Sequence, residues 1–574
     1  MKPRQGSGSP RGRRLTRRAL LRMGPGAAAA LTLGCAPRSP SPADRALDAG
    51  RITGRIVGAS HRIGHRLREG SLPEPQQVRE VAVVIVGAGM AGLSAAWKLA
   101  GAGFHDFTLL ELEPEPGGNA RWGENAVSAY PWGAHYLPTP TAESTAVREL
   151  VAEMGLILDH TPDGEPVYDP RHLCHAPQER VFVDGQWRAG LSARDLVDGG
   201  GTNRGDDGQV LAAFEQQVRR YRDYRDAKGR PAFALPVAAG TTDPEILALD
   251  RISMREYFDR AGWASARLRW YVDYCCRDDY GCTLDTTSAW AGWHYLCSRP
   301  AEGEYLTWPE GNGRIVRHFM NRAAGRIRTG MLVYRVRPAG AGPSRTSAVD
   351  GAGEPVARGV VDVDALDARD DSVIRFRARR CIYALPRFTA PRVIDGYPAS
   401  GSEAFTYSPW LVANLTVDRL PEGAAWDNVL YDSPSLGYVV ATHQNLRMTT
   451  GRSVLTYYLP LAVPNPHVAR TWMLEQDWRD WVALILADLG QAHPGIESLV
   501  THADIMLWGH AMIRPVPGFV WGEARRRAAA PYGPVRFAHS DMSGISLFEE
   551  AQYHGVRAAE EVMEELGHPF SSSL

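Results

Sequence analysis

Val-Ala-Val-Val-Ile-Val-Gly-Ala-Gly-Met-Ala-Gly, residues 81–92, is an apolar run that leads directly into a glycine turn. The first six residues are continuous and mostly β-branched, which is typical of a strand buried on both faces of a parallel sheet. The next six form G-x-G-x-x-G, the turn that joins such a strand to a helix in dinucleotide-binding folds. We expect Gly87 to turn the chain, Gly89 to let a pyrophosphate approach the backbone, and Gly92 to admit the helix.

The residues after the turn continue this pattern. A helix is predicted to continue from the turn over 93–102. The N–H groups of Met90 and Ala91, at the start of this helix, present its positive dipole end to phosphates. A second strand is predicted over 107–110 and ends at Glu111, twenty-four positions after Gly87. An acid at that place accepts hydrogen bonds from both ribose hydroxyls of a dinucleotide.

Length and charge narrow the class of protein. The chain has 574 residues, of which 44% are hydrophobic, so two domains around a large cofactor are expected. Eight of the 64 basic residues and none of the 65 acidic ones precede Cys35, which leaves 56 − 65 = −9 for the remainder. A mildly acidic body without a basic stripe argues against nucleic acid as a partner.

The N-terminus resembles a twin-arginine signal peptide. Arg17 and Arg18 precede a short apolar run at 27–33, which is too short to span a bilayer. This predicts export of the folded protein by the twin-arginine machinery to the periplasm or cell envelope. Cys35 lies in an imperfect lipoprotein box, so a lipid on this residue is the expected membrane link, with cleavage after Ala36 as the rival interpretation. An ordinary arginine-rich tail is the alternative to a signal.

A Pro/Ser linker at 37–42 leads into a basic arm at 45–80, predicted to be partly helical. His61 and His65 lie one helical turn apart in this arm, but two histidines do not define a metal site, and no metal is predicted. Six further cysteines lack paired C-x-x-C spacing and are expected to be buried thiols, with one disulfide left open: Cys174, Cys275, Cys276, Cys282, Cys297 and Cys381.

A double glycine follows the acid. Glu111 followed by Gly117-Gly118 resembles the extended FAD fingerprint of the flavin amine oxidase superfamily, which includes protoporphyrinogen oxidases and phytoene desaturases. This resemblance implies FAD as the cofactor, in preference to NAD. The family usually carries arginines on both sides of the double glycine, where this chain has Glu115 and Asn119, and Arg121 is a candidate substitute.

Three further segments resemble the same family in the same order. A glycine turn at 308–313 leads into a predicted helix at 314–324. The strand at 331–336 resembles the one whose backbone holds the adenine, which implies that Val333 contacts it. The strand and Ala-Leu-Pro turn at 379–386 resemble the segment that returns to the flavin.

The C-terminal segment carries the last match. Residues 537–541, Phe-Ala-His-Ser-Asp, resemble the Phe-Ala-Gly-Glu signature, with Asp541 in place of the acid. The resemblance implies that the N-terminus of the following helix, predicted over 549–565, points at the flavin and stabilises its reduced form. Leu547 and Phe548 precede this helix, where the family places a tyrosine of its aromatic cage.

These matches imply an α/β fold, a two-dinucleotide-binding-domain flavoprotein with a Rossmann-like FAD domain interleaved with an α+β substrate domain. The predicted FAD-binding segments are 81–140, 306–390 and 526–574. The predicted substrate-domain segments are 141–305 and 391–525, and they follow a signal peptide at 1–36 and a linker and basic arm at 37–80.

Candidate catalytic residues lie where the family places the flavin ring. The segment 130–136 corresponds to a stretch beneath the isoalloxazine, so His135 and Trp132 are candidates, with a purely structural loop as the alternative. Counting back from Pro517-Gly518, His510 takes the place of the covalently flavinylated cysteine of monoamine oxidases. It is a candidate for proton transfer, redox tuning or covalent attachment, or for a structural imidazole. Aromatic residues of the substrate segments are expected to belong either to the core or to a pocket wall: Trp270, Tyr271, Tyr274, Trp290, Trp293, Tyr295, Trp410, Tyr457, Tyr458, Trp508 and Trp521.

The predicted activity is transfer of a hydride equivalent from a substrate C–H to flavin N5, with electrons passed on to oxygen or an electron-transfer protein. The resemblance favours a small amine or amino-acid-like substrate. No lysine follows Lys228, so the family's water-holding lysine is absent, which keeps open a desaturase or isomerase of a hydrophobic C–C bond. A non-catalytic FAD-binding protein is the third possibility.

Overall fold

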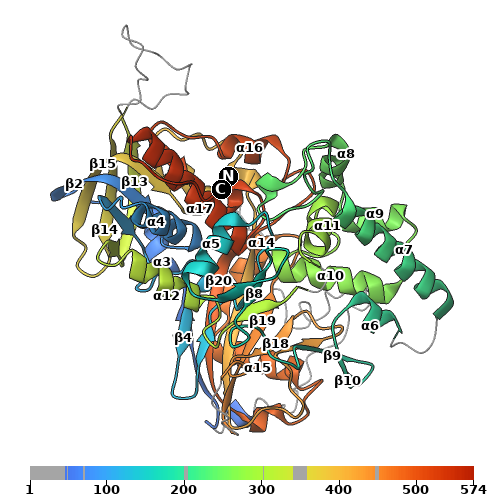
Figure 1. Ribbon diagram of the computed structural model, residues 1–574. Helices are drawn as coiled ribbons and strands as arrows, with labels where there is room; N and C mark the ends of the chain where they lie inside the picture. Colours follow the sequence, from blue (N-terminus) through green and yellow to red (C-terminus); the bar gives the residue numbers. More distant parts are fainter. Residues whose placement is uncertain are drawn as a thin grey trace, which may run out of the picture.

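The computed structural model describes residues 45–47, 50–68, 72–198, 204–300, 303–339, 359–445 and 451–574. Within these residues two large sheets and a group of helices make up the molecule (Figure 1). The signal peptide, Cys35 and the linker predicted before residue 45 lie outside the described part of the chain. No helix of the described part is long and apolar enough to cross a membrane.

The first sheet has the strand order β12-β3-β2-β15-β14-β13, in which β12 is Ile327–Arg328, and β21 (Val535–Phe537) also pairs with β15. Its central strands β2 (Gln77–Val86), β3 (Phe107–Leu110) and β15 (Val373–Tyr383) are parallel, while β14 (Val361–Asp367) and β13 (Met331–Pro338) are antiparallel additions. The predicted strand, glycine turn, helix and strand are confirmed, and the α/β fold class with them.

Two helices cover this sheet near the glycine turn. Helix α4 (Met90–Gly101) begins directly after the turn, and α17 (Phe548–Glu565) packs across it. A Cβ on Gly555 would lie only 2.2 Å from the Ala91 carbonyl oxygen, so the glycine is what permits this close packing. The N-terminus of α17 is thereby fixed beside the dinucleotide-binding turn.

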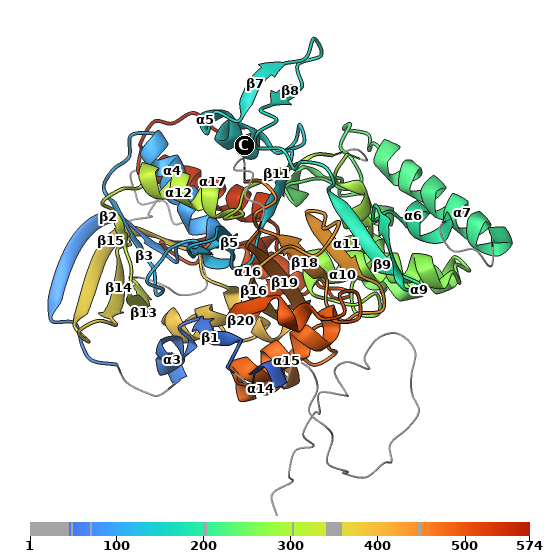
Figure 2. The same ribbon diagram turned by 90° about the horizontal axis from the view of Figure 1, so that it is seen from below.

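The second sheet has the order β1-β20-β16-β19-β18-β17-β9-β10. Its short strands are β1 (Thr53–Gly58), β18 (Gly437–Val440), β17 (Asp427–Leu430), β9 (Glu179–Val183) and β10 (Gln186–Ala189). Its long strands β16 (Tyr407–Val417), β19 (Ser453–Pro460) and β20 (Val500–Ile513) are antiparallel and carry the central core of the molecule. Helices α10 (Ala266–Tyr280) and α11 (Ala289–Cys297) lie with their neighbours on the side away from the first sheet (Figure 2). The space where the second sheet, the end of α10 and the N-terminus of α17 meet holds the candidate site.

The predicted basic arm differs from expectation in one respect. Residues 53–58 form strand β1 (Thr53–Gly58), which pairs in parallel with β20, and only the short α3 (His61–Gly64) and a 3-10 turn at 65–68 are helical. The arm therefore extends the second sheet. The six cysteines of the described residues are free and buried.

Candidate active site

The glycine turn forms a cradle with empty space at one position. Gly87 has φ +96°, in the region that favours glycine, and a Cβ on Gly92 would lie 1.8 Å from the Gly87 carbonyl oxygen. By contrast, a Cβ on Gly89 would meet no protein atom within 4 Å. The turn therefore needs its first and third glycines for its own packing, whereas the second leaves room for a ligand.

The double glycine closes one side of this cradle. Gly117 and Gly118 both have positive φ, and the Gly117 N–H donates to the Ala88 carbonyl at 2.8 Å. A Cβ on Gly118 would lie 3.1 Å from the Gly89 Cα. The glycine turn at 87–92 and the double glycine at 117–118 thus bring two stretches of backbone together around the space beside Gly89.

Glu111 is placed to receive a ribose. Its two carboxylate oxygens accept the backbone N–H groups of Ala88 at 2.7 Å and of Glu113 at 2.8 Å. Burial raises the pKa of Glu111, and these two hydrogen bonds oppose that rise. Each carboxylate oxygen has a second acceptor site, so both remain able to accept a ribose hydroxyl.

Arg121 carries N–H groups that a pyrophosphate could accept. Its side chain is only 8% exposed, and Nη1 donates to a Glu113 carboxylate oxygen at 3.1 Å. Nε and Nη2 are buried without a hydrogen-bond partner, and the guanidinium lies over Trp508, 5.1 Å from the ring centroid. Because buried N–H groups normally find acceptors, these two N–H groups fit a phosphate, and the donors present suit FAD.

We expect Arg121→Met to weaken FAD binding by on the order of tenfold to a hundredfold, since a charge-assisted hydrogen bond to the phosphate is lost. A fluorescence titration of the apoprotein with FAD measures this. Arg317→Met is the matched control, because Arg317 lies over Trp122 and pairs with Glu310. Equal FAD affinity in both variants would remove Arg121 from the cofactor site.

Some of the other predicted cofactor residues lie at the cradle, and the rest lie elsewhere in the fold. Met90, Ala91 and Asn119 lie at the cradle or next to it, and Asn119 Nδ2 donates to the Ala511 carbonyl at 2.6 Å. Val333 is buried in β13 where the strand bulges. The Asp541 carboxylate accepts hydrogen bonds from the Arg387 N–H and the Tyr407 hydroxyl, so its contribution to cofactor binding stays a prediction.

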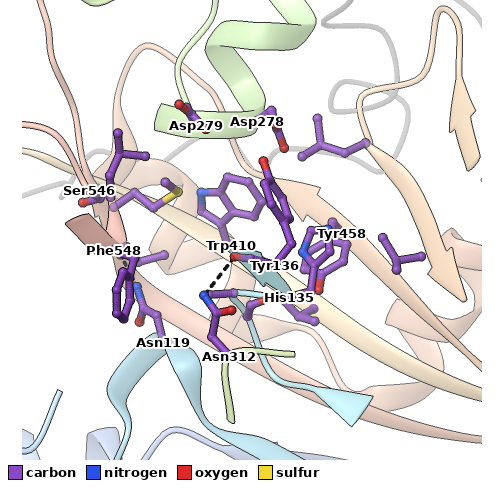
Figure 3. A pocket seen from close by; sticks show the side chains of 18 of the residues that line it. Asn119, His135, Tyr136, Asp278, Asp279, Asn312, Trp410, Tyr458, Ser546 and Phe548 are labelled. Carbon is purple, nitrogen blue, oxygen red and sulfur yellow. Dashed lines mark hydrogen bonds between the residues drawn. The ribbon is translucent and has the colours of Figure 1, made fainter. Parts of the chain in front are cut away.

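A cavity of about 190 Å³ is lined by strands of the second sheet, the end of α10 and the loop at 133–136 (Figure 3). Asn119, Asn312 and Phe548 line one side, and Leu547 and Phe548 place the N-terminus of α17 in its wall. Asn312 Nδ2 donates to the Tyr136 carbonyl at 3.0 Å, which fixes the loop that carries His135 and Tyr136.

Carboxylates line the opposite side of this cavity. Asp278 and Asp279 project from the last turn of α10, and Asp427 and Glu549 also line the wall (Figure 3 labels the first two). Burial raises the pKa of each of these acids, and Asp279 raises that of Asp278 further.

Arg299 is the cation in the same wall, and its Nη1 lies 3.2 Å from an Asp279 carboxylate oxygen. Burial lowers the pKa of its guanidinium, but Asp279 and Glu549 together raise it well above the ordinary value. Four acids therefore face one arginine among the described residues of the wall.

Aromatic rings fill the wall between these groups. Four of the aromatics considered from the sequence line the cavity: Tyr274, Trp410, Tyr458 and Trp508. Trp290 and Trp293 instead belong to the helical core, where Trp293 stacks with Phe214. An apolar wall excludes water and strengthens the field of the carboxylates.

The three candidate catalytic residues take different places. His135 lines the cavity with its ring centroid 4.8 Å from that of Tyr458, and burial lowers its pKa to about 3. Trp132 does not line the cavity, and its carbonyl accepts a hydrogen bond from Trp508 Nε1 at 2.7 Å. His510 is outside the lining residues, with its ring stacked on Phe388 at 4.4 Å.

Sequence reasoning did not single out the acids of the wall. The signal available was the pair Asp278-Asp279 at the end of an otherwise aromatic helix, four residues beyond Tyr274, which puts Tyr274 and Asp278 on one helical face. Arg299 carried no local pattern, and Asn312 lay in the predicted glycine turn at 308–313 without being singled out.

The comparisons with known proteins agree with this fold. A family model described as an NAD(P)-binding Rossmann-like domain matches residues 85–154. An L-amino-acid oxidase of Daboia russelii is 45% identical over 78 residues, which make up 13% of this chain and 15% of that protein. The chain thus matches only about 15% of the length of its curated relatives.

Solved structures extend the likeness over most of the chain. A putrescine oxidase variant with redesigned cofactor binding superposes with a TM-score of 0.60 at 16% identity, covering 85% of this chain and 100% of that one. A fatty acid isomerase from P. acnes gives a TM-score of 0.55 at 14% identity, covering 84% and 98%. The fold is therefore that of the flavin amine oxidases, with a Rossmann-like nucleotide-binding domain.

Proposed function

We propose that the protein is an FAD-dependent oxidoreductase that removes a hydride equivalent from the carbon next to the nitrogen of a cationic amine. The observation that carries this proposal is the set of acids and aromatic rings in one cavity beside the dinucleotide cradle. The cradle itself is supported by Gly89, Glu111 and Arg121 as described above. FAD, when bound, supplies the group that accepts the hydride.

The acids give the cavity its preference for a cation. Because burial raises the pKa of Asp278 to about 7, this group is protonated below that pH when the cavity is empty, and an ammonium ion brought into contact favours its ionised form. Amine affinity should therefore rise with pH up to the folded pKa of Asp278 and then stay level until the amine itself loses its charge. Asp278 and Asp279 hold and orient the ammonium, and Asp278 is the group placed to take its proton.

The remaining wall orients the carbon that reacts. Tyr136, Tyr458 and Trp410 surround the alkyl part of the substrate and keep water out. His135 is neutral at ordinary pH because its pKa is lowered to about 3, so it adds no charge that would repel an ammonium ion. These side chains position the substrate without taking part in proton transfer.

An isomerase or desaturase of an apolar chain is the second candidate, favoured by the structural likeness to the P. acnes isomerase. Four acids in the wall of the cavity weigh against it, because burying an apolar chain beside them would leave their polar groups without partners.

A substrate panel separates these functions. The purified protein is mixed anaerobically with alkylamines, diamines, amino acids and polyunsaturated fatty acids, and the flavin absorbance is followed. Bleaching by amines supports the proposal, and bleaching only by the fatty acids would replace it with the second candidate. A flavin that none of these compounds reduces would indicate a non-catalytic FAD-binding protein.

His510, which does not line the cavity, remains a candidate for a catalytic residue beside the flavin ring. Burial, with Arg470 and Arg68 nearby, lowers its pKa to about 3, so the imidazole is neutral and acts as a hydrogen-bonding or covalent group. We expect His510→Ala to retain FAD but to slow substrate-driven flavin reduction by on the order of a hundredfold. Stopped-flow reduction measures this, with His467→Ala on the exposed start of α14 (Pro466–Glu475) as the control. A wild-type rate would make His510 structural.

Export, processing and the electron acceptor are further proposals. The twin-arginine pattern at Arg17 and Arg18 supports translocation of the folded, cofactor-loaded protein to the cell envelope. Sequencing the N-terminus of the mature protein distinguishes a lipid-modified Cys35 from cleavage after Ala36. Oxygen consumption during turnover distinguishes oxygen from an electron-transfer protein as acceptor.

A further inference from the structure

A second cavity, of about 620 Å³, adjoins the one beside the cradle. Pro138 lines the first cavity and Thr139 the second, and Arg299 lines both. Helix α7 (Arg204–Asp223) contributes Tyr221 and Arg222 to the wall of the second cavity. Arg299 therefore lies in the wall that the two cavities share.

The two cavities differ in charge. Four acids and Arg299 line the inner cavity, whereas the described residues of the outer wall include four arginines and three glutamates. Arg148 is paired with Glu165 at 2.8 Å. Arg225 donates its Nη1 to two backbone carbonyls, and Arg222 donates its Nη2 to the Leu296 carbonyl at 2.7 Å. Arg148 and Arg299 are thus paired with carboxylates, whereas Arg222 and Arg225 have no carboxylate partner among the described residues.

Two of these arginines carry buried N–H groups that have no partner. Nε of Arg222 and Nε of Arg299 are both inaccessible to solvent and make no hydrogen bond. An unsatisfied buried donor costs free energy, and on a charged group the cost is greater. A carboxylate accepts N–H groups of guanidinium in a strong, charge-assisted geometry, so it is the group that would satisfy both arginines.

We propose that the substrate carries a carboxylate remote from its reacting nitrogen, held in the outer cavity by Arg222 and Arg299. This rests on the proposed function, in which Asp278 and Asp279 hold the ammonium end. In an α-amino acid the two charges are attached to the same carbon, whereas here Asp278 lines only the inner cavity and Arg222 only the outer one, and Arg299, which pairs with Asp279, lines both. The geometry therefore favours an ω-amino acid over an α-amino acid or a simple alkylamine.

The test compares ligands of matched length on the FAD-loaded protein. Anaerobic stopped-flow flavin reduction over a range of ligand concentrations gives the apparent Kd of 6-aminohexanoate, hexylamine and L-norleucine. We expect 6-aminohexanoate to bind at least about tenfold more tightly than hexylamine, the scale of one charge-assisted hydrogen bond. This comparison on the wild-type protein does not depend on the folding of any variant.

Variants then show which residues cause the preference for 6-aminohexanoate over hexylamine. Arg222→Met and Arg299→Met should each abolish the advantage of 6-aminohexanoate over hexylamine. Arg219→Met should retain it, because Arg219 lies on the same helix but is exposed near Glu215. Equal affinity for the two ligands in the wild type, tighter binding of L-norleucine, or an unchanged advantage in both arginine variants would overturn the inference. Hexylamine that binds and bleaches the flavin without any carboxylate preference would overturn it while leaving the proposed function standing.

Discussion

Gly89→Val should yield a folded protein that contains no FAD. A Cβ at this position would meet no protein atom within 4 Å, and the residue has φ −72° and ψ −177°, an extended backbone that valine also adopts. The added side chain therefore disturbs no contact of the apoprotein but fills the space reserved for the pyrophosphate. We expect the FAD affinity to fall by more than about a hundredfold, because the phosphates lose both room and backbone donors.

The FAD content of the purified protein and the Tm of the apoprotein measure this together. Gly101→Val is the control, since Gly101 also has open space around its Cβ position but lies at the far end of α4. Gly92 would be a poorer choice, because its Cβ would lie 1.8 Å from the Gly87 carbonyl oxygen and the fold itself would suffer. Stoichiometric FAD in Gly89→Val would refute the cofactor assignment.

Asp278→Asn with Asp279→Asn should remove most of the response to amines while FAD stays bound. The two carboxylates line the cavity from the last turn of α10 beside Tyr136 (Figure 3), and Asp427 and Glu549 are the acids that remain in the wall of the variant. Loss of charge-assisted contacts to the ammonium should reduce kcat/KM for flavin reduction by about a hundredfold or more. Asp285→Asn, an exposed acid paired with Arg255, is the control.

The Tm of the variants distinguishes a loss of amine binding from a loss of folding. The pKa of Asp278 is raised in the folded protein, so the folded state holds a proton that the unfolded chain releases as pH rises above about 4. Asp278 therefore lowers the stability progressively as pH increases toward its folded pKa, and Asn removes this effect. The Tm difference between Asp278→Asn and the wild type should become more positive from pH 5 to pH 8. A variant that melts earlier than the wild type at pH 8 would make Asp278 a structural residue.

The dinucleotide-binding unit could be predicted because its signals are local. The β-branched run before Gly87, the spacing to Glu111 and the strand at 107–110 each depend on neighbours in the sequence, and each is present in the structure. Helix α17 was likewise predicted nearly to its ends from its own pattern.

The rest depends on contacts between distant segments. Strand β1 forms because residues 53–58 pair with β20, more than 440 residues later, and nothing near β1 indicates a strand. The same holds for the cavity, whose wall combines Tyr136, Asp278 and Arg299 from three separate segments. Aromatic content alone did not distinguish Trp410, which lines the cavity, from Trp293, which lies in the core.

The most direct test of the central claim is the rate of anaerobic flavin bleaching by an alkylamine with two deuterium atoms on the carbon next to nitrogen. If that C–H bond breaks as the flavin is reduced, the deuterated amine should bleach the flavin several-fold more slowly than the ordinary amine. The acid-lined cavity also predicts that this bleaching is lost in the Asp278→Asn, Asp279→Asn variant. Equal bleaching rates for the two isotopic forms, or no bleaching by any amine, would contradict the account.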